Sequence, residues 1–121
     1  MILVDTSIWV SHFRSGNAHL RELLKKGEVV SHPFIIGELA CGNLKNRKEI
    51  LSLLQALPTT TTAGQEEVLQ LIENQRLMGL SLGYVDVHLL AAALLTAASL
   101  WTNDRNLKEV AIRLRVAYKG A

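Results

Sequence analysis

The N-terminal stretch MILVDTSIWV (residues 1–10) places a carboxylate, Asp5, directly after a run of apolar residues. The first five residues predict a short buried strand, and the following TSIWVSHF predicts a helix capped by Thr6 or Ser7. In open parallel sheets, ligands bind outside the carboxyl ends of the strands. We therefore expect Asp5 to lie at the edge of a sheet that presents functional groups.

Short apolar runs alternate with helical patterns along the rest of the chain. Asn17 is placed to cap a second helix, and Pro33 suits the first turn of a third. Further strands are expected at EVVSH and SLWT, and the runs TTTT and VAYK are also prone to form strands. Strands that alternate with helices predict an α/β fold, with a parallel sheet between two helical layers.

Length and composition limit the functional classes. The chain has 121 residues, which predicts a single domain over residues 1–121, and its apolar fraction of 49% is typical of a globular protein. Its single cysteine, Cys41, excludes an intrachain disulfide and is expected to be a small buried residue. The longest apolar run, LLAAALL, is too short to cross a bilayer. We expect a cytoplasmic protein with no membrane contact.

Four acidic residues depart from the usual pattern of acids on the polar face of a helix. Asp5 and Asp104 each follow an expected strand. Asp86 begins the most apolar helix, in register with leucines three and four residues later, and Glu38 borders the apolar face of the third helix. If the fold brings these four together, their repulsion is strong, because two charges ~4 Å apart cost about 4 kcal/mol at an effective dielectric constant of ~20.

Clustered carboxylates of this kind suit a hard divalent cation, Mg²⁺ or Mn²⁺, and metal-assisted phosphodiester hydrolysis. With these four acids neutralised, thirteen basic residues face seven acidic ones, which would attract a polyanion such as RNA. The candidate phosphate contacts are Lys45, Arg47, Lys48 and Arg105.

Four segments, in this order and spacing, resemble the PIN-domain family, and more narrowly the VapC-type toxins of toxin–antitoxin pairs. They are VDTS, IGELACG, GYVDVHLLAAAL and LWTNDRNL. The resemblance extends over essentially the whole chain. It implies a three-layer α/β/α sandwich with a short parallel central sheet, and a Mg²⁺-dependent ribonuclease that forms a homodimer. It also implies a VapB-like antitoxin partner, through which alone the complex would bind DNA.

The resemblance implies a role for each of the four acids. Asp5 and Asp86 match the metal ligands of the family, and Glu38 and Asp104 would complete the catalytic pocket, directly or through water. Two residues after Asp104, many relatives carry another Asp, whereas this chain has Asn106. The amide supplies an oxygen ligand with less charge, which leaves open whether one or two ions bind.

The resemblance also implies supporting roles for small polar residues. The hydroxyls of Thr6 or Ser7 and of Thr102 match groups that assist this site in the family. Ser7 also counts against an aspartyl phosphatase, which requires a second acid at that position. The four histidines have no metal-ligand spacing and are not expected to be catalytic.

Other interpretations of the acids remain open from sequence alone. Asp5 and Asp104 could serve as helix caps, and Asp86 could complement a helix dipole. The alternative function is a catalytically inactive metal-binding PIN-fold module that binds RNA or a protein partner.

Overall fold

Seven helices and three short strands form the described part of the chain. The computed structural model describes residues 1–120. The strands are β1 (Ile2–Val4), β2 (Val29–Val30) and β3 (Ser99–Trp101). The helices are α1 (Thr6–Ser15), α2 (Ala18–Lys25), α3 (Pro33–Ala40), α4 (Arg47–Ala56), α5 (Gln65–Gln75), α6 (Tyr84–Thr96) and α7 (Arg105–Arg113).

The three strands form a parallel sheet in the order β2-β1-β3. Leu3 in the central strand pairs with Val30 on one side and with Leu100 on the other. The chain leaves β1 toward β2 and later returns past β1 to form β3. The order of strands therefore reverses at β1, and the carboxyl ends of β1 and β3 form the switch point at which ligands bind in such sheets.

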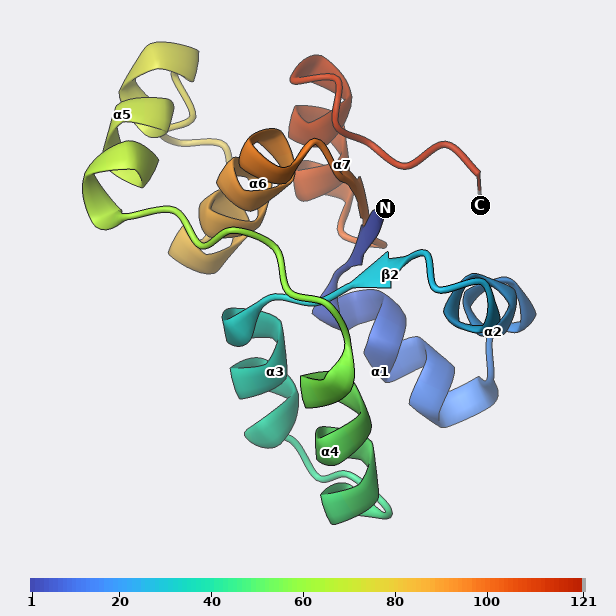
Figure 1. The fold of residues 1–121 in the computed structure, drawn as a ribbon. Helices are drawn as coiled ribbons and strands as arrows, with labels where there is room; N and C mark the ends of the chain where they lie inside the picture. The colour runs from blue at the N-terminus through green and yellow to red at the C-terminus, as the bar shows by residue number, and fades with distance from the viewer. Residues whose placement is uncertain (121) are drawn as a thin grey trace.

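Helices cover both faces of the sheet (Figure 1). The first four helices gather on one side, where α3 packs against both α1 and α4. The other side carries α5, α6 and α7, with α6 packed against α5 and β3. The expected α/β/α sandwich with a short parallel sheet is confirmed.

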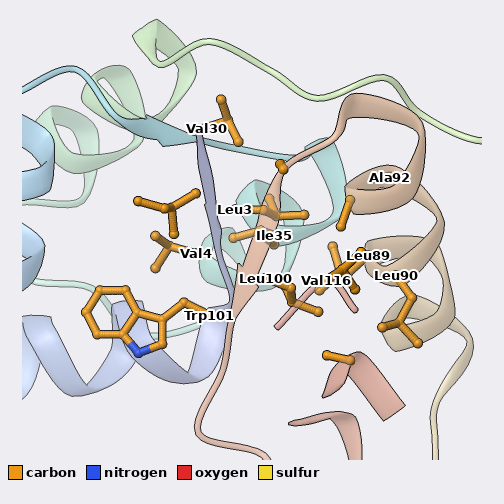
Figure 2. Close-up of a cluster of buried hydrophobic side chains, with 14 of the residues drawn as sticks. Leu3, Val4, Val30, Ile35, Leu89, Leu90, Ala92, Leu100, Trp101 and Val116 are labelled. Atoms are coloured by element: carbon orange, nitrogen blue, oxygen red, sulfur yellow. The ribbon is translucent and has the colours of Figure 1, made fainter. Parts of the chain in front are cut away.

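The alternation of side chains along the strands divides the core between the two faces (Figure 2). Leu3 and Leu100 point toward α6, on the side where Leu89 lies. Val4 and Trp101 point to the opposite face. Because β1 is buried on both faces, it is apolar throughout, as is typical of a central parallel strand.

Local signals fixed two helix starts as expected. The Asn17 side chain accepts a hydrogen bond from the backbone N–H of Leu20 at the start of α2, and Pro33 occupies the first turn of α3. The cap of α1 differs from the prediction: it is Asp5, not Thr6 or Ser7. The Asp5 side chain, one residue before the first helical turn, can reach the free backbone N–H groups of that turn. The hydroxyls of Thr6 and Ser7 lie inside the turn and do not reach them.

Two expected strands and one expected burial were wrong. Within residues 1–120, the run TTTT contributes only a bridge between Thr59 and Ser31, and VAYK only a bridge between Ala117 and Leu100. Cys41 is exposed rather than buried, because it follows the last turn of α3. α6, the longest helix, has 13 residues and is too short to span a bilayer, and no other helix in residues 1–120 meets the requirement.

Candidate active site

Asp5 stands at the carboxyl end of β1 and is held by four neighbours. Its backbone N–H donates to the carbonyl of Trp101 at 2.9 Å, which completes the pairing of Val4 with Trp101. Its Oδ1 accepts from the N–H of Thr6 at 2.7 Å. Its Oδ2 accepts from the hydroxyls of Thr102 at 2.6 Å and Ser7 at 2.9 Å. Asp5 is only 7% exposed, so its carboxylate has a fixed orientation.

Asp104 follows β3 and is joined to Asp5 through one hydroxyl. The Thr102 Oγ1 that donates to Asp5 accepts from the backbone N–H of Asp104 at 3.0 Å. Asp104 is exposed and caps α7, because its Oδ1 accepts from the N–H of Leu107 at 3.0 Å. The buried hydroxyl of Thr102 therefore couples the ends of two neighbouring strands.

Glu38 reaches the same region from α3. Its Oε1 accepts from the Thr6 hydroxyl at 2.7 Å, and the backbone N–H of Thr6 in turn donates to Asp5. Glu38 itself is exposed. One residue at the start of α1 thus contacts two of the four predicted acids.

Asp86 lies in the first turn of α6, where it is half-buried. Its Oδ2 accepts from the backbone N–H of Gly83 at 2.9 Å, which completes the start of the helix. Burial raises the pKa of the Asp86 carboxyl, the hydrogen bond from Gly83 opposes this rise, and the negative charges of Asp104, Asp5 and Glu38 add to it. The other three predicted acids therefore lie close enough to Asp86 to act on its carboxyl.

Three of the four carboxylates each keep an oxygen available. In Glu38, Asp86 and Asp104, one oxygen accepts a protein hydrogen bond, and no group within residues 1–120 donates to the other. The side-chain ion pairs within the same residues are Lys25–Glu22 and Arg105–Glu109, so none of the four acids is neutralised by a basic side chain. This donor set fits a hard divalent cation. However, no three Asp, Glu, His or Cys side chains in the described part of the chain are already arranged around a single ion.

The small polar residues divide into two groups. Thr6, Ser7 and Thr102 all hydrogen-bond to predicted acids. Asn106 is exposed and lines a hollow of about 400 Å³ beside Arg113. None of the four acids lines this hollow. A role for Asn106 as a metal ligand stays a prediction.

The predicted basic contacts also differ among themselves. Lys45 and Lys48 are exposed near the start of α4, and Arg105 forms an exposed ion pair with Glu109 at 3.5 Å. Arg47 instead donates to the backbone carbonyls at the end of α3, those of Ala40 and of Gly42. Arg47 therefore joins α3 to α4, and its charge is already partly engaged.

A buried pair of histidines lies between α3 and α6, which was not predicted from the sequence. His32 is fully buried and caps α3, since its Nδ1 accepts from the N–H of Phe34 at 3.0 Å. His88 is 4% exposed, and its ring centroid lies 6.4 Å from that of His32. Burial, reinforced by the neighbouring His88, lowers the pKa of His32 to about 4. The only sequence signal was the position of His32 directly before Pro33.

Comparisons with known proteins place this geometry in a family. The PIN domain family matches residues 2–113. Ribonuclease VapC32 from two strains of Mycobacterium tuberculosis is 45% identical over 118 residues, which are 97% of this chain and 95% of the relative. The fold is similar to the crystal structure of PAE2754 from Pyrobaculum aerophilum, with a TM-score of 0.60, 18% identity, and coverage of 94% and 88% of the two chains. The chain belongs to the PIN-domain family and, within it, to the VapC-type proteins.

Proposed function

We propose that this protein is a metal-dependent endoribonuclease, the toxin of a toxin–antitoxin pair. The curated relative that it matches along 97% of its length is named a ribonuclease. The observation that carries the proposal is the set of free carboxylate oxygens on Glu38, Asp86 and Asp104, with Asp5 beside them and no basic side chain in residues 1–120 to neutralise them.

Asp5, Glu38, Asp86 and Asp104 are the proposed ligands of the metal. Bound there, Mg²⁺ or Mn²⁺ would polarise the phosphate of the substrate and favour attack by water. No three of these side chains already surround a point within residues 1–120, so metal binding would require the exposed Glu38 and Asp104 to move toward the other acids. Asp5, which three donors hold in place, supplies the fixed part of the site.

The protein groups around the acids set their orientation. Thr102 and Ser7 hold Oδ2 of Asp5, and Thr6 holds Oε1 of Glu38. We assign these hydroxyls a positioning role, because each donates its proton to a carboxylate and has none left for the substrate. Lys45, Lys48 and Arg105 remain the proposed contacts with RNA phosphates, whereas Arg47 acts mainly within the fold.

The proposed partners follow from the relative's name and from the unpaired acids. A VapB-like antitoxin with a basic side chain would neutralise the carboxylates that no residue among 1–120 pairs with. We also propose that the protein is a homodimer in the cytoplasm and that DNA binding belongs to the antitoxin alone.

The decisive experiment compares Asp86→Asn with Glu73→Gln. Asn can still accept the hydrogen bond from Gly83, so the start of α6 is retained while the charge is lost. Glu73→Gln removes an exposed charge on α5 and is the matched control. We expect the wild type and Glu73→Gln to cleave single-stranded RNA with Mg²⁺ and not with EDTA, and Asp86→Asn to be inactive in both. Metal-independent cleavage, or full activity of Asp86→Asn, would exclude the proposed site, and RNA binding without cleavage by the wild type would favour the inactive module.

A further inference from the structure

A hollow of about 230 Å³ lies at the carboxyl end of β3, and its lining includes Thr102, which hydrogen-bonds to Asp5. Trp101 and Tyr118 supply aromatic walls, and Asn17, Asn103 and Lys108 supply polar groups. The predictions from sequence assigned no role to this combination. It differs from the apolar hollow between α1, α2 and α4, because polar groups make up a large part of its lining.

The hollow shares its wall with the proposed active site. Thr102 lines it and donates its hydroxyl proton to Asp5 at 2.6 Å. The backbone N–H of Asn103 donates to the hydroxyl of Ser7 at 3.0 Å. The backbone N–H of Lys108 donates to the carbonyl of Asp104 at 2.9 Å. A group bound in the hollow would therefore lie next to residues that hydrogen-bond to Asp5 and Asp104, two of the proposed metal ligands.

The aromatic walls are held in place. The Tyr118 hydroxyl and His19 Nε2 are 2.6 Å apart, and the two rings stack with their centroids at 5.9 Å. The Trp101 ring lies 5.5 Å from each of them, centroid to centroid. Since Trp101 is 8% exposed, it presents only part of its ring to the hollow. The half-buried Tyr118 therefore offers the larger aromatic surface to a flat ring.

The polar groups of the hollow are available to a ligand. Within residues 1–120, no protein group hydrogen-bonds to the side-chain amide of Asn103, and Lys108 forms no ion pair. Asn17 uses its Oδ1 to cap α2, which leaves its amide N–H groups free. The hollow therefore offers amide donors and acceptors next to one cation.

We propose that this hollow binds one unpaired nucleobase of the RNA substrate next to the cleaved phosphate, that Asn103 sets the base preference there, and that Lys108 binds the phosphate attached to that nucleotide. Proteins read single-stranded RNA by contacting the faces of unstacked bases with aromatic side chains and by hydrogen bonds to their edges. The amide of Asn103 suits a base edge, and the ammonium of Lys108 suits the phosphate attached to that nucleotide. This inference rests on the proposed ribonuclease function.

The first test measures binding without metal, so it does not depend on catalysis. Nucleoside monophosphates are added, in EDTA, to ¹⁵N-labelled protein, and the indole N–H signals of Trp9 and Trp101 are followed by NMR. We expect the Trp101 signal to shift and the Trp9 signal to stay. Ribose 5-phosphate, which lacks the base, should shift Trp101 much less. Absent shifts, or equal shifts with ribose 5-phosphate, would overturn the inference.

The second test sequences the cleavage products of a randomised single-stranded RNA pool. Asn103→Ala should reduce the preference at one position flanking the cut by about fivefold or more, the factor lost with one good base contact. Lys108→Ala should weaken cleavage of all sequences alike, because a phosphate contact carries no sequence information. Lys26→Ala, which removes an exposed lysine outside the hollow, should leave the profile unchanged. An unaltered profile in Asn103→Ala would overturn the inference while the ribonuclease stands. A wild type that binds nucleotides but cleaves no RNA would refute the proposed function, and with it the link between the hollow and cleavage.

Discussion

Replacing Thr102 with Val removes the hydroxyl that couples the ends of β1 and β3 while it keeps nearly the same volume. Thr102 is 5% exposed, so water cannot easily replace the lost group. Its hydroxyl donates to Oδ2 of Asp5 at 2.6 Å and accepts from the N–H of Asp104 at 3.0 Å. The substitution therefore leaves a buried carboxylate and a backbone N–H without one partner each.

The expected loss follows from these two bonds. A hydrogen bond to a charged group contributes about 1.5–3 kcal/mol, and a neutral one about 0.5–1.5 kcal/mol. We expect Thr102→Val to lower the free energy of unfolding at pH 7 by roughly 2–4 kcal/mol. Thr102→Ser keeps the hydroxyl and should lose only about 1 kcal/mol, for the buried methyl group. Cleavage should fall with Thr102→Val, because Asp5 loses part of its fixed orientation.

Urea unfolding followed by circular dichroism measures these differences. Thr96→Val is the matched control, since the Thr96 hydroxyl accepts a single hydrogen bond, from Thr61 at 3.1 Å, in an exposed position. A double-mutant cycle with Asp5→Asn should give a coupling free energy of about 1 kcal/mol or more. If Thr102→Val lies within about 0.5 kcal/mol of the wild type, as an ordinary surface change would, the coupling of the two strand ends through this hydroxyl is refuted.

Three further predictions concern charge. Burial and the other three acids raise the pKa of Asp86, so its negative charge destabilises the folded protein at pH 7. Asp86→Asn should therefore raise the Tm in EDTA and abolish the rise in Tm that Mg²⁺ produces. An unchanged Tm in EDTA would contradict this. His32 has a pKa near 4 when folded and about 6.5 when unfolded, so the unfolded chain binds more protons between these values and stability should fall as pH drops from 6.5 toward 4. His32→Asn, which can still cap α3, should show a smaller fall in urea unfolding, and an equal fall would exclude His32 as the cause. The double variant Lys45→Ala, Lys48→Ala should flatten the salt dependence of RNA binding without loss of stability. Arg47→Ala should instead lower stability, because it removes the hydrogen bonds that join α3 to α4. The reverse pattern would refute the assignment of the lysines to RNA and of Arg47 to the fold.

The fold was predictable because its signals are local. Asn17 caps α2 through a residue three positions later, and Pro33 favours a helix start at its own position. The apolar run at residues 2–4 indicates a strand that is buried on both faces. The wrong strand predictions, in the runs TTTT and VAYK, failed for the opposite reason. A run prone to form a strand needs a partner along its length, and each run finds only one bridging contact within residues 1–120.

The acids of the candidate site could be selected from the sequence, but the hydrogen-bond network around them could not. The position of Asp5 after a buried strand could be inferred from sequence. Its bond to Thr102, 97 residues away, depends on the pairing of β1 with β3. The buried contact between His32 and His88 likewise depends on how α3 and α6 pack, which no pattern in either helix encodes.

Capping and ligation, which appear as competing interpretations in the sequence, are compatible in the fold. Asp5 caps α1, Asp104 caps α7, and Asp86 binds the backbone N–H of Gly83 before α6. A helix N-terminus favours negative charge, so three helix starts offset part of the repulsion among the acids before any cation arrives. Each cap also fixes the carboxylate through one oxygen, and in Asp86 and Asp104 no group within residues 1–120 donates to the second. The same hydrogen bonds that begin the helices thus anchor one oxygen of Asp86 and of Asp104, while the second oxygen of each stays available to a metal ion.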